Sequence, residues 1–144
     1  MELKINLDTE ETNQLTEYLL EILNQQQKHF FPDHQTVDKP VSIGIYSETK
    51  LLGGILGRIN DQSLYVSLLA INPNNQGNNL GTQLLRNIEN VAVENRVINL
   101  LLSTRSYQAL PFYQKNGFKV YGKLKDMPFL GVDTYYLVKR LKYV

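Results

Sequence analysis

The stretch from Ile71 to Leu85, INPNNQGNNLGTQLL, has the composition of a loop that could bind an anion through its backbone. It contains five asparagines, two glycines and one proline, and no charged side chain. It follows an apolar run and leads into residues with helical spacing, so it joins a buried strand to the start of a helix. Free N–H groups in the first turn of a helix, together with the helix dipole, favour an anion. On composition alone, a turn and helix cap without a ligand is the more frequent case.

The residue types also indicate how this loop could curve. Gly81 adopts positive φ without cost, and Gly77 and Asn79 could do the same, which would curl the chain around a phosphate. Two familiar nucleotide-binding loops do not fit. The sequence has no G-x-x-x-x-G-K-[ST], which excludes a Walker loop. Its G-x-x-x-G spacing after an antiparallel meander does not match a dinucleotide-binding fold.

Other side chains with chemical potential are fewer. One of the nine tyrosines could protonate a leaving group, since a phenol has a pKa near ~10, although most tyrosines only span core and surface. Ser106 precedes a helical stretch, where a serine is more often a cap. His29 and His34 flank FFPD without a supporting ligand cluster, so we expect no metal site and assign them to a solvated loop or to the lining of a binding pocket. The absence of cysteine excludes a thiolate nucleophile and a cysteine zinc site.

Hydrophobic periodicity predicts the elements that position these residues in an α+β domain. Asp8 and Glu11 form a variant capping box for a helix that frays around NQQQKHFFPDH. Apolar residues from Leu80 to Ala92 recur at helical spacing, and Asn116–Gly117 ends a short helix. The predicted strands are an edge strand at 4–7, an antiparallel meander of 41–47, 51–59 and 63–71, a buried strand at 97–102, and two last strands at 119–124 and 134–141.

Composition bounds the class of protein. The chain has 144 residues, 42% of them hydrophobic and 20% charged, which fits one globular domain over residues 1–144. We see no secretory signal and no apolar run of ~20 residues, so a cytoplasmic, bacterial-type enzyme without a membrane segment is expected. The net charge of +1 argues against nucleic-acid binding. From Arg105 onward the chain has eight Lys or Arg and only two Asp. This excess of positive charge indicates either a solvated basic face or an anion-binding surface.

Two segments resemble a known family. SLLAINPNNQGNNLGTQLL resembles the acyl-CoA loop of the GNAT superfamily of N-acetyltransferases, whose pattern is a strand, [R/Q]-x-x-G-x-[G/A] and a helix. Asn79 replaces the first glycine of that pattern. SYQALPFYQKNGFKVYG resembles the N-x-x-A-x-x-x-Y-x-x-x-G-F segment of the same family, with Ser106 in place of the asparagine. The resemblance extends from Leu3 to Leu141, and the residues that match the second pattern are Ala109, Tyr113, Gly117 and Phe118.

The resemblance implies a GNAT fold, with helices flanking a mixed, mainly antiparallel sheet that splays between its fourth strand (63–71) and its fifth (97–102). It implies acetyl-CoA as co-substrate and no metal. The pantetheine arm would pair with the backbone of the fourth strand, and the pyrophosphate would lie on the loop and helix start. Tyr113 would be the general acid. The implied CoA-binding residues are Leu69, Ala70, Ile71, Gln76, Gly77, Asn78, Asn79, Leu80, Gly81, Thr82 and Ser106.

The first functional interpretation is therefore an N-acetyltransferase that acts on a primary amine of a small molecule or peptide by direct attack. The sequence does not identify the general base, because neutral Ser67 stands where many relatives carry Glu. The alternative is a catalytically weak or inactive CoA-binding regulatory module, since Ser67, Asn79 and Ser106 all depart from the family pattern. Nucleic-acid binding through the basic C-terminal part is a third interpretation, with less support than the other two. The oligomeric state stays open, and a homodimer is one alternative because many relatives form dimers.

Overall fold

The computed structural model of the protein describes residues 1–142, which belong to two compact units, residues 1–35 and the part from Thr36 onward. The elements are α1 (Thr9–Phe30), β1 (Asp38–Ser47), β2 (Lys50–Asn60), β3 (Ser63–Ile71), the 3₁₀ turn η1 (Pro73–Asn75), α2 (Leu80–Glu94), β4 (Asn99–Arg105), α3 (Leu110–Lys115), β5 (Lys119–Leu124) and β6 (Thr134–Arg140).

The first unit is the helix α1 with the residues that lead into it. The Asp8 half of the predicted capping box is confirmed, because the backbone of Asp8 is extended and its side chain accepts a hydrogen bond from Glu11 N at 2.8 Å. The predicted fraying around NQQQKHFFPDH is confirmed only in part: the helix ends within this stretch, at Phe30, but its polar first part is fully helical, and helical bonding continues until Phe31 N donates to Gln27 O. The predicted edge strand at 4–7 is also wrong: these residues lie in no strand and are exposed, and four alternating residues gain nothing without a neighbour to pair with.

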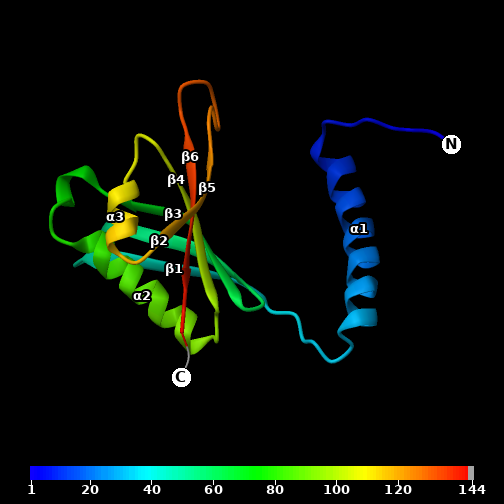
Figure 1. The fold of residues 1–144 in the computed structure, drawn as a ribbon, viewed down its shortest axis with the longest axis horizontal. Helices are drawn as coiled ribbons and strands as arrows, with labels where there is room; N and C mark the ends of the chain where they lie inside the picture. Colours follow the sequence, from blue (N-terminus) through cyan, green and yellow to red (C-terminus); the bar gives the residue numbers. More distant parts are fainter. Residues whose placement is uncertain (143–144) are drawn as a thin grey trace. The chain divides into compact units, whose positions relative to one another are not determined.

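The second unit is built on a six-stranded sheet in the order β1-β2-β3-β4-β6-β5. Within the described residues, β3 and β4 form the parallel pair and the other neighbours are antiparallel. The expected mixed, mainly antiparallel sheet is thus confirmed, with six strands rather than seven. In Figure 1, β1 to β3 run roughly horizontally, whereas β4 to β6 run roughly vertically.

The splay of the sheet lies between β3 and β4. Their parallel pairing covers three residue pairs, from Ser63 with Asn99 to Tyr65 with Leu101. Beyond this point β3 continues to Ile71 and β4 to Arg105 without pairing to each other. The expected splay is confirmed, and it leaves backbone N–H and C=O groups of β3 facing a gap.

The helices α2 and α3 lie on the same side of the sheet (Figure 1). Apolar residues of α2 at i, i+3 and i+4 spacing pack on β1, β2 and β3, as its periodicity predicts. Leu84 and Ile88 are fully buried there, against Ile55 and Leu64 of the sheet. This packing fixes where α2 begins, and its first turn is consequently held at the mouth of the splay.

Candidate active site

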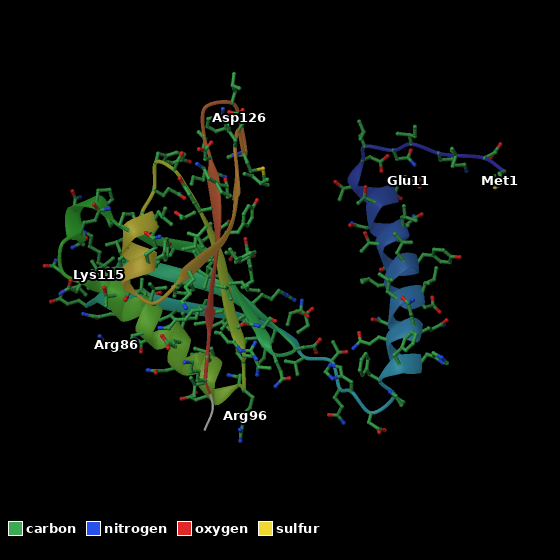
Figure 2. All side chains as sticks on the ribbon, viewed as in Figure 1. Met1, Glu11, Arg86, Arg96, Lys115 and Asp126 are labelled. Atoms are coloured by element: carbon green, nitrogen blue, oxygen red, sulfur yellow. The ribbon has the colours of Figure 1, made fainter. Side chains whose placement is uncertain are left out.

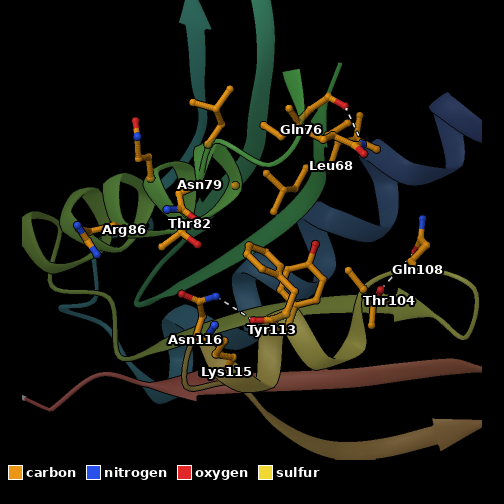
Figure 3. Close-up of a pocket in the computed structure, with 18 of the residues that line it drawn as sticks. Leu68, Gln76, Asn79, Thr82, Arg86, Thr104, Gln108, Tyr113, Lys115 and Asn116 are labelled. Carbon is orange, nitrogen blue, oxygen red and sulfur yellow. Dashed lines mark hydrogen bonds between the residues drawn. The ribbon is translucent and has the colours of Figure 1, made fainter. Parts of the chain in front are cut away.

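A pocket of about 1090 Å³ opens at the splay (Figure 3). Residues 67–71 of β3 form one wall, and residues 103 and 104 of β4 lie across the gap. The loop and the first turns of α2 form a second wall, and α3 with its preceding residues forms a third. Chain segments that are distant in sequence thus meet around one space.

The β3 wall offers its main chain. Leu69, Ala70 and Ile71 line the pocket and pair with β2 on their other side. Because β4 has diverged, the opposite edge of this strand is available to an extended ligand, as in strand addition. Gln76 braces the end of the strand by donating from Nε2 to Ile71 O at 3.4 Å.

The loop curves through two residues with positive φ. Gly77 has φ +90° and Asn79 has φ +57°, so the predicted curling at both is confirmed. Gly81 was expected to use the same freedom, and this is wrong, because it lies inside α2 with ordinary helical backbone. A glycine is favoured at position 81 for lack of space instead, since a Cβ there would lie 3.1 Å from Cζ of Phe112 on α3. The glycine lets α2 and α3 approach.

The first turn of α2 is left without a side-chain cap. A capping side chain needs an extended backbone, and Asn79 is left-handed, so its side chain makes no cap hydrogen bond. The first intrahelical bond runs from Gln83 N to Asn79 O at 3.1 Å. The N–H groups of Leu80, Gly81 and Thr82 therefore have no partner within the helix, and no acidic residue lies in this turn.

A buried polar atom lies unsatisfied in the same wall. Oδ1 of Asn75 is buried and has no hydrogen-bond partner, although the residue lines the pocket. A buried carbonyl oxygen without a donor is unfavourable in a folded protein, so a ligand N–H would stabilise it.

Tyr113 enters the pocket from α3, and its hydroxyl group points away from that helix (Figure 3). The ring packs edge-on against Phe112 at 5.2 Å and Phe118 at 6.1 Å between centroids. Burial raises the pKa of the Tyr113 hydroxyl above its ordinary value, so the phenol is protonated at neutral pH. A half-buried, protonated hydroxyl can donate a proton to a group that leaves within the pocket.

The position of α3 is tied to α2 by one lysine. Lys139 Nζ on β6 donates to Glu89 Oε2 of α2 at 2.8 Å and to Asn116 O at the end of α3 at 3.1 Å. The predicted role of Gly117 in ending the helix is supported by its φ of +93°. A Cβ at Gly117 would also lie 3.1 Å from Lys139 Cε.

Two residues expected at the CoA site do not line the pocket. Asn78 turns back to donate to Asn75 O at 3.4 Å. Ser106 bonds to the residue before β6: its N–H donates to Asp133 O at 2.8 Å and its Oγ accepts from Asp133 N at 3.1 Å. Ser106 is no helix cap either, because Ala109 occupies that position and α3 begins at Leu110. The other predicted residues line the pocket together.

Sequence reasoning missed several lining residues. Arg86, Lys115 and Asn75 belong to this group, as do Thr104 and Gln108 across the pocket. Only Arg86 carried a usable signal, since it lies four residues after Thr82 and so on the same face of α2. Within residues 1–142 there is no cluster of three or more side chains able to hold a metal, and no helix is long and apolar enough to cross a membrane.

A family model described as the acetyltransferase (GNAT) domain matches residues 8–127. The chain belongs to this family. Among curated proteins, blasticidin-S acetyltransferase of Streptomyces morookaense is 33% identical over 93 residues, which make up 64% of this chain and 68% of that protein.

Solved structures agree with the GNAT assignment. An acetyltransferase from Bacillus cereus ATCC 14579 superposes with a TM-score of 0.82 at 28% identity, over 96% of this chain and 98% of that one. A GNAT family acetyltransferase from Elizabethkingia anophelis, solved with acetyl-CoA bound, superposes with a TM-score of 0.63 at 18% identity, over 69% of this chain and 75% of that one. At that identity the second likeness concerns the fold.

Proposed function

We propose that this GNAT protein transfers an acetyl group from acetyl-CoA to a primary amine of a small molecule or peptide, with Tyr113 as general acid. One observation carries the proposal. A single pocket joins the uncapped first turn of α2, the unpaired edge of β3 and the hydroxyl group of Tyr113. These are an anion site, a strand-like docking edge and a proton donor.

The pocket residues fit CoA by their chemistry. The N–H groups of Leu80, Gly81 and Thr82 suit a pyrophosphate at a helix N-terminus. The edge of β3 at 69–71 suits the extended, amide-containing pantetheine arm. The buried Oδ1 of Asn75 suits a ligand N–H.

The reaction forms one C–N bond and breaks one C–S bond. A neutral amine attacks the thioester carbonyl carbon, and a backbone N–H of the β3 edge stabilises the negative charge that develops on the carbonyl oxygen. The sulfur leaves with the electron pair of the C–S bond and takes the proton of the Tyr113 hydroxyl. The attacking nitrogen loses one proton to water, because the hydroxyl of Ser67, which donates to Leu56 O at 3.3 Å, is not a base at neutral pH. The Tyr113 phenolate takes a proton back from solvent, so that the protons balance over one turnover.

The relatives support a small acceptor. The name of the Streptomyces morookaense relative designates a small molecule, blasticidin-S, as its acceptor, and it matches this chain at 33% identity. A second candidate is a CoA-binding module without catalysis. It is favoured by the hydroxyls of Ser67 and Ser106, which are taken up by internal hydrogen bonds.

Calorimetric titration of the purified protein tests the binding step. Acetyl-CoA and desulfo-CoA are expected to bind at micromolar concentration and ATP, which lacks the pantetheine arm, is not. A panel of primary amines with thiol detection then tests the chemistry. Amine-dependent release of CoA supports the enzyme, binding without release supports the second candidate, and absence of binding rejects both.

A further inference from the structure

Two cations line one end of the pocket. Arg86 extends from α2 and Lys115 from α3, both on the side of the sheet that carries the helices (Figures 2 and 3). In the close-up, both lie on the opposite side of the pocket from Thr104 and Gln108. Arg86 follows Thr82 by one helical turn, so it continues the face on which the uncapped N–H groups lie.

Neither positive charge is neutralised within the described part of the chain. Ion pairs in this part of the chain include Arg58 with Asp38, Lys123 with Asp133, and Lys139 with Glu89, and none of these uses Arg86 or Lys115. Glu89 is the acid that would reach Arg86 along α2, at i+3, but its carboxylate is held by Lys139 at 2.8 Å. The lysine of β6 thus leaves Arg86 available to a ligand.

The position of these cations relative to the α2 first turn indicates a second anionic group on the ligand. The first turn offers uncharged donors that suit a pyrophosphate, whereas Arg86 and Lys115 lie beyond it and are full charges. Acetyl-CoA carries such a group, a phosphate monoester on the ribose 3′ oxygen that is close to a dianion at neutral pH. A guanidinium and an ammonium are the side chains that bind phosphate best.

We propose that Arg86 and Lys115 form a subsite for the ribose 3′-phosphate and thereby select CoA over carriers that lack it. This inference rests on the proposed function. The rejected carriers are dephospho-CoA and a phosphopantetheine arm attached to a protein. Because both side chains are exposed and screened by water, we expect the subsite to give roughly tenfold selectivity rather than an absolute requirement.

The experiment is a calorimetric comparison of CoA with dephospho-CoA on the full chain. The wild type is expected to bind CoA about tenfold more tightly, and the preference should shrink as salt is raised. Arg86→Gln and Lys115→Gln should each weaken CoA binding severalfold and leave the affinity for dephospho-CoA unchanged. That unchanged affinity also shows that each variant is folded.

Two matched variants control for net charge. Arg140→Gln and Lys119→Gln remove the same charges from exposed positions outside the pocket and should keep the preference. Equal binding of CoA and dephospho-CoA by the wild type overturns the subsite and leaves the proposed function intact. Loss of the preference in the control variants overturns the subsite as well. If neither nucleotide binds, the proposed function fails together with it.

Discussion

The α2 wall and the α3 wall of the pocket work by different means. The start of α2 offers three main-chain N–H groups, and its loop residues matter mainly through their backbone angles. On the α3 wall the proposed proton donor is a side chain, the hydroxyl of Tyr113, whose ring packs against Phe112 and Phe118. Binding by backbone tolerates changes of side chain, whereas proton donation depends on one residue. The two walls should therefore respond to mutation in different assays.

The largest expected effect comes from placing a charge on the α2 wall. Thr82→Glu puts a carboxylate in the uncapped first turn, where it repels a pyrophosphate at close range. We expect acetyl-CoA binding to weaken at least about thirtyfold, measured by calorimetry. The thermal stability should not fall, because an acid in the first turn of a helix is favourable to the helix itself.

Thr82→Gln is the control for size, since it differs from the glutamate only in charge. It should bind acetyl-CoA within about threefold of the wild type. Equal losses in the two variants would show that the side chain at 82 acts by volume, and the anion site at the α2 first turn would then have to be given up.

The next effect belongs to the α3 wall. Tyr113→Phe keeps the ring packing and removes the proton donor, so we expect turnover at least about tenfold slower with an unchanged dissociation constant for acetyl-CoA. Steady-state CoA release and calorimetry measure the two quantities. Tyr121→Phe, at an exposed tyrosine outside the pocket, should change neither. Turnover that survives in the Tyr113 variant removes this residue from the mechanism.

The sequence predicted some helices and strands better than others. The strand bounds of β3 and β5 and the end of α3 at Gly117 came out as expected, because apolar alternation and a glycine stop are local signals. The strand at 4–7 was wrong, since pairing needs a neighbour that local pattern does not reveal. The helix α1 outlasted its polar stretch because glutamine and lysine are good helix formers.

The candidate site shows the same limit. Positive φ at Gly77 and Asn79 follows from residue type, but the close approach of Gly81 to Phe112 depends on how two helices pack. Arg86 and Lys115 lie 29 residues apart in the numbering and meet at one pocket only through the tertiary fold. Local sequence signals could not have brought them together.

A smaller effect tests the tolerance of the α2 wall. At Asn79 the left-handed backbone is available to asparagine and glycine, but costs an alanine roughly 1–2 kcal/mol. Asn79→Gly should bind acetyl-CoA within about twofold of the wild type, and Asn79→Ala about fivefold more weakly. Asn78→Ala is the neighbouring control and should not differ from the wild type, because Asn78 does not line the pocket. A glycine variant as weak as the alanine variant would show that the Asn79 side chain itself binds.

The smallest effect isolates the environment of Tyr113 from its chemistry. Burial raises the pKa of its hydroxyl, so above pH ~10 the unfolded chain releases this proton before the folded one does. The folded state then holds more protons than the unfolded state, and the free energy of unfolding falls as the pH rises toward the folded pKa. Melting temperatures measured from pH 8 upward should therefore fall more steeply for the wild type than for Tyr113→Phe. Tyr121→Phe should follow the wild type. Parallel curves for wild type and Tyr113→Phe would mean that the hydroxyl is solvated, and a solvated phenol would not be held on the α3 wall as a donor to a leaving thiolate.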